Sequence, residues 1–256
     1  MSRSVSTMVM VLLWPCMVFA AHPLITDDAG TQGKGKFQLE VNGQYDSDRE
    51  TANGASVKTT GGQAAIALTY GIIDSVDLAA GLPYQGIREK DAGVLVSNER
   101  GISDATLDIK WRFFERDGFS FAVKPGASFP TGDEDKGLGA EKTGYHVFLI
   151  WTTEAAPWAF HANLGYVRNE SKFDENKNLW HASIAATYEV VENLKLVGNI
   201  GSESNPEKTA DRNPAFLIAG VLYSFADNLD VDFGVKAGLN KSETDYSILA
   251  GLTYRL

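Results

Sequence analysis

The stretch KFQLEVNGQY, residues 36–45, decides between the fold classes open to this chain. Phe37, Leu39, Val41, Gly43 and Tyr45 occupy alternate positions, and polar residues fill the positions between them. Alternation with a period of two is typical of a β-strand whose two faces meet different surroundings. The apolar face is buried in a water-soluble protein, or it contacts lipid in an outer-membrane barrel.

The same alternation recurs along the chain, with no helical periodicity between the repeats. Connections of four or five residues alternate with long polar connections, which predicts an even-numbered meander with short turns at one rim and long loops at the other. The predicted strands are 37–45, 64–70, 76–84, 105–113, 119–129, 145–151, 158–166, 180–188, 194–200, 215–223, 229–239 and 246–256.

The distribution of side chains along these strands favours the membrane alternative. Aromatic residues gather near the predicted strand ends, whereas Val, Leu, Ile and Ala fill the centres. Two aromatic girdles are typical of two membrane–water interfaces. The opposite face mixes Gly and Ala with charges of both signs, which indicates a confined polar lumen. We therefore predict an all-β fold, a 12-stranded antiparallel up-and-down transmembrane β-barrel with short periplasmic turns and long extracellular loops.

The N-terminus carries the pattern of a secretory signal. Arg3 is the only charge before an apolar run that ends at Phe19, and small residues follow. We expect a signal peptide at 1–20, cleaved after Ala20 or alternatively after Ala21, a periplasmic N-terminal segment at 21–35, and the barrel at 36–256. The motif DDAG at 27–30 is turn chemistry, or it begins a short periplasmic plug.

Charge and the C-terminus indicate the partners. Without residues 1–20 the chain has 22 basic and 33 acidic residues, a net charge of −11, which argues against nucleic acid. The ending YSILAGLTYRL resembles the signal read by the outer-membrane assembly machinery, although Leu256 stands where an aromatic residue is usual. The expected partners are this machinery, outer-membrane lipid, lipopolysaccharide and a small-molecule solute, at the outer membrane of a Gram-negative bacterium.

Charged and histidine residues in inward phase are the candidate lumen-lining residues. We predict two cross-strand pairs, Asp108 with Lys124 and Asp230 with Arg255. Such pairs either brace a narrow barrel or set the field that a solute crosses; the alternating signs favour bracing. The candidates are Glu40, Asp77, Asp108, Lys110, Arg112, Lys124, His146, His161, His181, Lys195, Asp230, Asp232, Lys236 and Arg255.

No metal or cofactor site is expected. The three inward histidines have no third ligand placed by geometry, so they are interpreted as satisfied polar residues of the lumen. The loop TGDEDKGLGAE, residues 131–141, holds four acids among glycines, but its spacing departs from an EF-hand. A solvated loop is the first interpretation, and calcium binding is the alternative.

Four stretches carry a family resemblance: HPLITDDAGTQGKGKFQLE, TYGIIDSVDLAAGLPYQ, GISDATLDIKWRF and VKPGASFPTGDEDKGLG. They are similar to the family named for the MetA pathway of phenol degradation, and the resemblance covers nearly the whole chain after the signal. The resemblance implies an outer-membrane barrel of the transporter kind. The family's name suggests passage of small apolar or aromatic compounds.

Three functions are compatible with these features. The first is a passive outer-membrane channel or uptake protein, because twelve strands enclose a modest lumen. The second is an outer-membrane enzyme acting on lipid; no catalytic residue is assigned, because no Ser–His pair converges in the predicted arrangement and lipid-facing positions hold no histidine. The third is a structural or adhesive barrel that works through its loops. We favour the channel and expect no enzymatic activity.

Overall fold

The computed structural model describes residues 22–52 and 55–256; the predicted signal peptide lies outside this range. No helix among the described residues is both long and apolar enough to cross a membrane, and the short 3-10 helix η1 spans Glu134–Lys136. The strands are β1 (Phe37–Ala52), β2 (Ala55–Ile73), β3 (Val76–Asp91), β4 (Val94–Ile102), β5 (Ala105–Arg116), β6 (Phe119–Phe129), β7 (Gly144–Ala155), β8 (Trp158–Arg168), β9 (Asn178–Val191), β10 (Leu194–Glu203), β11 (Ala215–Ala226), β12 (Leu229–Gly238) and β13 (Tyr246–Arg255).

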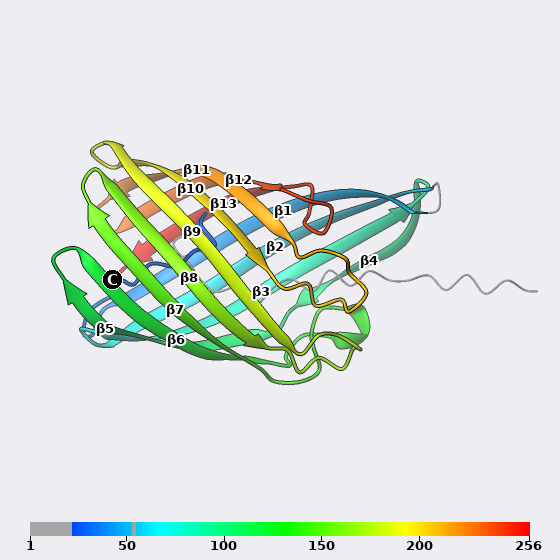
Figure 1. Ribbon diagram of the computed structural model, residues 1–256, viewed down its shortest axis with the longest axis horizontal. Coiled ribbons are helices and arrows are strands. Elements are labelled where there is room, and N and C mark those ends of the chain that lie inside the picture. The colour runs from blue at the N-terminus through cyan, green and yellow to red at the C-terminus, as the bar shows by residue number, and fades with distance from the viewer. Residues whose placement is uncertain (1–21, 53–54) are drawn as a thin grey trace, which may run out of the picture.

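These strands close into a ring (Figure 1). Each barrel strand pairs antiparallel with its neighbour, and the seam joins β1 to β13 from Gln38 opposite Arg255 to Ser47 opposite Tyr246. The pairing of β2 with β3 completes the circle. The predicted 12-stranded antiparallel barrel is therefore confirmed.

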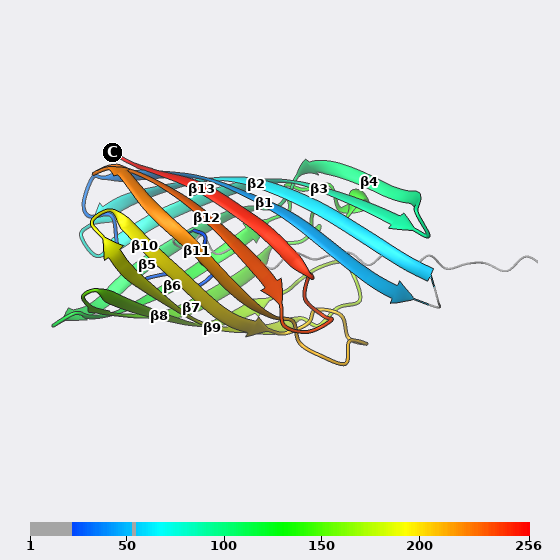
Figure 2. The same ribbon diagram turned by 90° about the horizontal axis from the view of Figure 1, so that it is seen from above.

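β4 is the one strand beyond the twelve of the ring among the described residues. It and β5 pair with the same edge of β3, one after the other along that strand. The C-terminal part of β3, from Tyr84 onward, pairs with β4, beginning with Tyr84 opposite Ile102. The N-terminal part of β3 pairs with β5 up to Gly81 opposite Thr106. Ser103 and Asp104 interrupt this strand position between β4 and β5. The first four strands extend beyond the rim of the others (Figures 1 and 2).

This extension corrects the prediction of long loops at 46–62 and 85–103. Within the described residues, 46–52, 55–62, 85–91 and 94–102 belong to paired strands instead, for example Lys58 opposite Lys90. The prediction was wrong because it equated polarity with loop structure. Strands that continue beyond a membrane need backbone partners but no apolar face, so their sequence can be polar.

The remaining connections follow the predicted alternation. Two-residue turns lie at one end, including Asp117–Gly118, where both residues have positive φ angles of 51° and 79°. The other end carries the connections 130–143, 169–177, 204–214 and 239–245. We call these ends the short-turn rim and the long-loop rim; in outer-membrane barrels the short turns are periplasmic.

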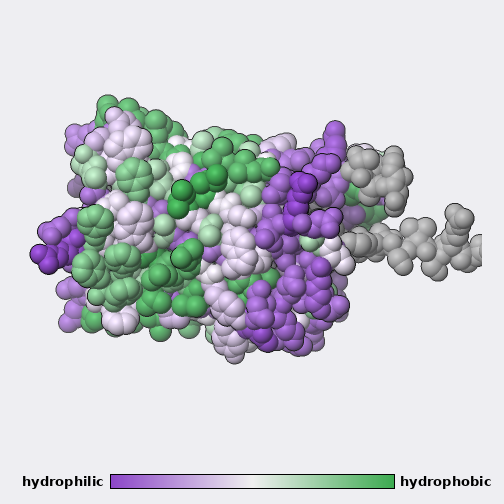
Figure 3. Space-filling model, in the orientation of Figure 1, coloured by the Kyte–Doolittle hydropathy of each residue, from purple (hydrophilic) through white to green (hydrophobic). Residues whose placement is uncertain are grey.

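The apolar face of each barrel strand points outward. On β5, Leu107 and Trp111 are 41% and 51% exposed, whereas Thr106 and Asp108 are buried. Aromatic contacts gather near the short-turn rim, as between Trp158 and Tyr188, whose ring centroids lie 4.7 Å apart. Apolar surface covers much of the barrel wall, and polar surface gathers at the long-loop rim (Figure 3). This is the pattern of an outer wall that contacts hydrocarbon.

Leu107→Arg tests this orientation. A cation near the bilayer midplane should lower the free energy of unfolding by about 2–4 kcal/mol, whereas Val94→Arg, on β4 in the extension, should lower it by about 0–1 kcal/mol. Urea unfolding in lipid vesicles, followed by the gel shift between heated and unheated protein, measures both values. Equal losses in the two variants would contradict the outward placement of Leu107.

Candidate functional site

The N-terminal segment, residues 22–35, lies inside the barrel. It is the dark blue chain within the ring in Figures 1 and 2. At the short-turn rim the backbone N–H of Gly35 donates to the carbonyl of Gly71 at 2.8 Å. Further inside, the N–H of Ala29 donates to Thr152 Oγ1 at 2.9 Å. The segment therefore enters from the short-turn rim and fills part of the lumen, while the sequence-based boundary at residue 35 and its periplasmic assignment stay predictions.

One carboxylate of this segment neutralises two lysines of the barrel wall. Asp27 Oδ1 lies 2.9 Å from Lys110 Nζ on β5, and Asp27 Oδ2 lies 2.6 Å from Lys124 Nζ on β6. The side chains of Asp27 and Lys124 are each only 3% exposed. Removing one partner from such a buried group leaves a charge uncompensated, which is strongly destabilising. Asp27 is thus the main electrostatic anchor of the segment.

Asp28 strengthens this anchor. Burial alone would raise its pKa, but Lys110, His161, the N–H of Gly30 and Lys124 together hold the pKa below the usual carboxyl range. A lowered pKa in the folded state means that Asp28 stabilises the docked segment above the ordinary carboxyl pKa. This contribution is lost as the pH falls through the lowered value.

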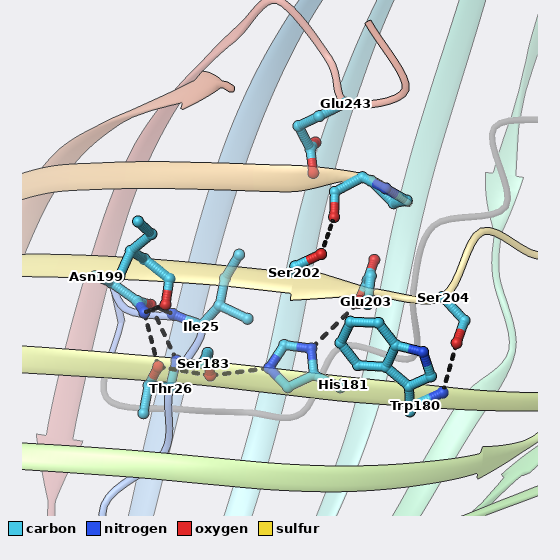
Figure 4. Close-up of polar contacts among 12 residues, drawn as sticks. Ile25, Thr26, Trp180, His181, Ser183, Asn199, Ser202, Glu203, Ser204 and Glu243 are labelled. Carbon is cyan, nitrogen blue, oxygen red and sulfur yellow. Dashed lines mark hydrogen bonds and ion pairs between the residues drawn. The ribbon is translucent and has the colours of Figure 1, made fainter. Parts of the chain in front are cut away.

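A second anchor joins the segment to β9 and β10 (Figure 4). Asn199 Oδ1 accepts hydrogen bonds from the backbone N–H groups of Ile25 and Thr26, at 2.7 and 3.1 Å. Asn199 Nδ2 donates to Thr26 Oγ1, which in turn donates to Ser183 Oγ, both at 2.7 Å. This network was not predicted, because no property of Asn199 alone distinguishes it from other inward polar residues.

The third anchor is His22, whose Nδ1 lies 2.5 Å from Asp232 Oδ1 on β12. Beside it, the ring of Pro23 packs on Gly234, where an added Cβ would lie 2.9 Å from the Pro23 Cβ. Some of the small inward residues seen in the sequence therefore make room for the N-terminal segment. A confined lumen was predicted, but the segment that occupies it was left as one of two alternatives.

The predicted pair between Asp108 and Lys124 is wrong. Asp108 lies opposite Gly126 on β6, because the hairpin turns tightly at Asp117–Gly118 and places Arg116, not Phe113, opposite Phe119. This turn displaces the register by three residues from the expected pairing, and the shift between Arg112 and Phe114 takes back one of them. Asp108 Oδ1 instead lies 2.5 Å from His146 Nε2 on β7. The contact passes over Gly126, where a Cβ would lie within 2.3 Å of both side chains.

The predicted pair between Asp230 and Arg255 forms, with Arg255 Nη2 2.7 Å from Asp230 Oδ2. Its register differs from the expected one, because Asp230 lies opposite Thr253. The long arginine side chain spans this diagonal.

The other lumen candidates are distributed over the inner wall. Lys236 pairs with Glu243 at 2.9 Å, and Arg112 pairs with Glu115 at 3.1 Å. Asp77 accepts the backbone N–H of Gln32 at 3.0 Å. Glu40 is buried on β1, and Lys195 is exposed near the short-turn rim. Their role in a functional site stays a prediction.

The remaining histidines make polar contacts with the wall. His161 Nδ1 lies 2.9 Å from Thr152 Oγ1. His181 Nε2 lies 2.9 Å from Ser183 Oγ, and its Nδ1 lies 3.2 Å from Glu203 Oε2. The expectation that no Ser–His pair converges is therefore wrong: the two residues are two positions apart on one strand face, a spacing that could have revealed them.

No three His, Cys, Asp or Glu side chains converge as a metal site would require within residues 22–52 and 55–256. In the acidic loop, Asp133 pairs with Lys136 at 2.6 Å, and Asp135 pairs with Lys172 at 3.4 Å. These lysines compete with any cation for the carboxylates.

Large apolar side chains also point into the lumen, and they were not among the predicted lining residues. Phe148 and Ile150 on β7, Phe216 and Ile218 on β11, and Leu249 on β13 are all less than 5% exposed. Phe148 packs over Gly165, and its ring centroid lies 5.8 Å from that of His181. Their inward phase was readable from the alternation, but the small and charged residues around them suggested a uniformly polar face.

A cavity of about 350 Å³ remains beside the segment. It is bounded by the N-terminal segment on one side and by β1, β2, β3, β5, β6, β11, β12 and β13 on the other. Its charged lining includes Glu40, Asp77 and Asp230 together with Lys110, Lys124 and Arg255. The volume falls in the lower range of small-molecule pockets, roughly 300–1,000 Å³.

A closed ring with an apolar outer wall and a charged, partly filled lumen defines a β-barrel of the outer-membrane type. The family model described as "Putative MetA-pathway of phenol degradation" matches residues 23–256, and the chain belongs to this family. The predicted resemblance is thus confirmed. No curated protein matches the sequence.

Solved structures share the fold at low identity. The COG4313 outer membrane channel from Pseudomonas putida F1 has a TM-score of 0.69 at 14% identity, covering 90% of this chain and 98% of its own. The NanC porin has a TM-score of 0.56 at 10% identity, covering 85% and 100%. A mutant of the TodX monoaromatic hydrocarbon channel has 0.51 at 11% identity, covering 88% and 91%.

Gly126→Ala tests the contact between Asp108 and His146. A methyl group at this position should separate the two buried side chains and lower the free energy of unfolding by about 1–3 kcal/mol. Gly43→Ala is the matched control, because its Cβ would have no neighbour closer than 3.6 Å. Urea unfolding in vesicles measures both; an unchanged Gly126→Ala variant would show that the contact contributes nothing.

Proposed function

We propose that this protein is a passive outer-membrane channel for small solutes, with small aromatic compounds as the first candidates. The observation that carries the proposal is the cavity of about 350 Å³ inside a closed ring. The family's description and the channel names of structural neighbours support the solute class. A barrel of this size passes solutes down their gradients without an energy source.

The lumen is divided into two parts. On the side of β7, β10 and β11 it is packed by apolar residues and by the N-terminal segment. The cavity leaves room near the short-turn rim, between the segment and β1, β2, β3, β5, β6, β11, β12 and β13. The route that we propose passes through this cavity, past the carboxylate of Glu40.

The N-terminal segment narrows this route. It is held by ion pairs and hydrogen bonds to Lys110, Lys124, Asn199 and Asp232, and its link to β1 lies at the short-turn rim. When one partner of such a contact is removed, water can take its place and the segment is held less tightly. The width of the route therefore depends on how firmly the segment is docked.

We also infer that the barrel is a channel and not a lipid hydrolase. The hydrogen-bonded chain from Ser183 through His181 to Glu203 resembles the order of a catalytic triad. However, Ser183 is 6% exposed and its hydroxyl accepts a hydrogen bond from Thr26. Because a nucleophile needs access to its ester, we interpret Ser183 as an anchor for the segment.

The outer wall supports the remaining proposed partners. Exposed Leu, Ile, Val and aromatic side chains match membrane lipid, and charged loops at the long-loop rim match the lipopolysaccharide headgroup region. We expect the outer-membrane assembly machinery to recognise the C-terminal strand β13.

Planar-bilayer recording tests the channel. We expect discrete conductance steps from the wild type, with transient blockade by a single-ring aromatic solute. Asp27→Asn should raise the conductance severalfold, because it removes the charge that holds the segment to two lysines. Asp117→Asn is the matched control, since Asp117 is exposed at the short-turn rim. No conductance, together with no solute uptake into vesicles, would refute the channel.

A further inference from the structure

Glu40 differs from the other acids of the cavity. It lies on β1, is 5% exposed and faces the cavity. Among the described residues it forms no ion pair; its polar neighbour on the same strand face is Gln38, which hydrogen-bonds its carboxylate. A buried carboxylate without a cationic partner is costly, so such groups are usually paired or bind a ligand.

The cations near Glu40 are already committed. Lys110 and Lys124 both contact Asp27, and Arg255 contacts Asp230. Asp108 pairs with His146, and Asp77 accepts the backbone N–H of Gln32. The described lining therefore holds more negative than positive charge, and Glu40 is its acid on β1.

A second, independent observation lies on β1 and the neighbouring strand β2, beyond the residues that line the cavity. Asn42 Oδ1 and Gln63 Oε1 are buried without a hydrogen-bond partner, and each residue is 8% exposed. Further along β1, away from the short-turn rim, Asp46 Oδ2 is also unpartnered. All three atoms are acceptors, so a group that satisfies them has to donate hydrogen bonds.

A further buried oxygen without a hydrogen-bond partner lies on the same row of the sheet as Glu40, three strands away. Glu40 lies opposite Ala67, Ala67 opposite Gly81, and Gly81 opposite Thr106, whose Oγ1 is buried and unpartnered. Ala67 and Gly81, which lie between Glu40 and Thr106 on this row, are themselves buried. We call Glu40, Asn42, Gln63 and Thr106 the acceptor wall.

We propose that the acceptor wall binds small organic cations, with a primary ammonium group at the carboxylate of Glu40. An ammonium carries one positive charge and three hydrogen-bond donors and no acceptor, which complements the carboxylate of Glu40 and the unpaired Oδ1 of Asn42, two residues along the same strand face. A carboxylate solute of the same size has only acceptors, and the negative wall repels it. The inference rests on the proposed channel for the route and adds the solute class.

Three single-ring probes of matched size distinguish the chemistries: benzylammonium, benzyl alcohol and benzoate. Isothermal titration calorimetry of the full-length barrel in detergent measures their binding without requiring conduction. Benzylammonium should bind about tenfold tighter than benzoate, because a close charge pair in a partly desolvated site dominates the difference. Benzyl alcohol should fall between them.

Glu40→Gln tests the residue. It keeps the shape and the polar contacts but removes the charge, so benzylammonium affinity should fall about tenfold while benzyl alcohol affinity stays within about twofold. Asp117→Asn, which removes the same charge at the exposed rim, should change neither value. Migration of unheated protein on gels verifies that each variant is folded.

The outcomes separate this inference from the channel. Equal binding of benzylammonium and benzoate, no binding of any probe, or unchanged benzylammonium affinity in Glu40→Gln would each overturn the acceptor wall. Benzylammonium binding without conductance or vesicle uptake would retain the wall and refute the channel. Conductance with equal permeability to potassium and chloride, and no preference in binding, would retain the channel and refute the wall.

Discussion

The pairing of strand edges around the closed ring is the constraint on which this structure depends. Hydrocarbon offers no hydrogen bonds to a backbone, so a sheet can cross a membrane only when its first and last strands meet. Here the seam between β1 and β13 extends over ten residue pairs, from Gln38 to Ser47. Closure forces alternate side chains into an enclosed space, and that space then has to accommodate the charges it receives.

The enclosed charges explain why the N-terminal segment lies inside. Lys110 and Lys124 lie on neighbouring inner faces and need a shared counter-ion, which Asp27 supplies. Asp232 and Asn199 provide matching contacts for His22 and for the backbone at Ile25 and Thr26. The apolar inward residues fill a further part of the lumen. The cavity is therefore the part of the lumen that neither group occupies.

The fold could be predicted from sequence because period-two alternation repeats in every barrel strand and because lipid selects aromatic girdles. The hairpins beyond the membrane were mistaken for loops, since strands in water carry no such alternation between lipid and lumen. Pairing between particular side chains was harder to predict. The tight turn at Asp117–Gly118 and the one-residue shift near Arg112 place Asp108 beside His146 instead of opposite Lys124. The Asp-Gly dipeptide is a signal for such a turn, but nothing in the local sequence indicates the shift. Contacts of the N-terminal segment depend on three-dimensional closure and leave no periodic signal.

The attachment of the N-terminal segment has a consequence for biogenesis. The segment joins β1 through Lys36 at the same end where it enters the ring. Its docking therefore requires no threading between strands, and the cylinder can be completed before the segment folds into it. Insertion and occlusion are thus separable events in time, so a newly inserted barrel can pass through an empty state before Asp27 reaches its two lysines.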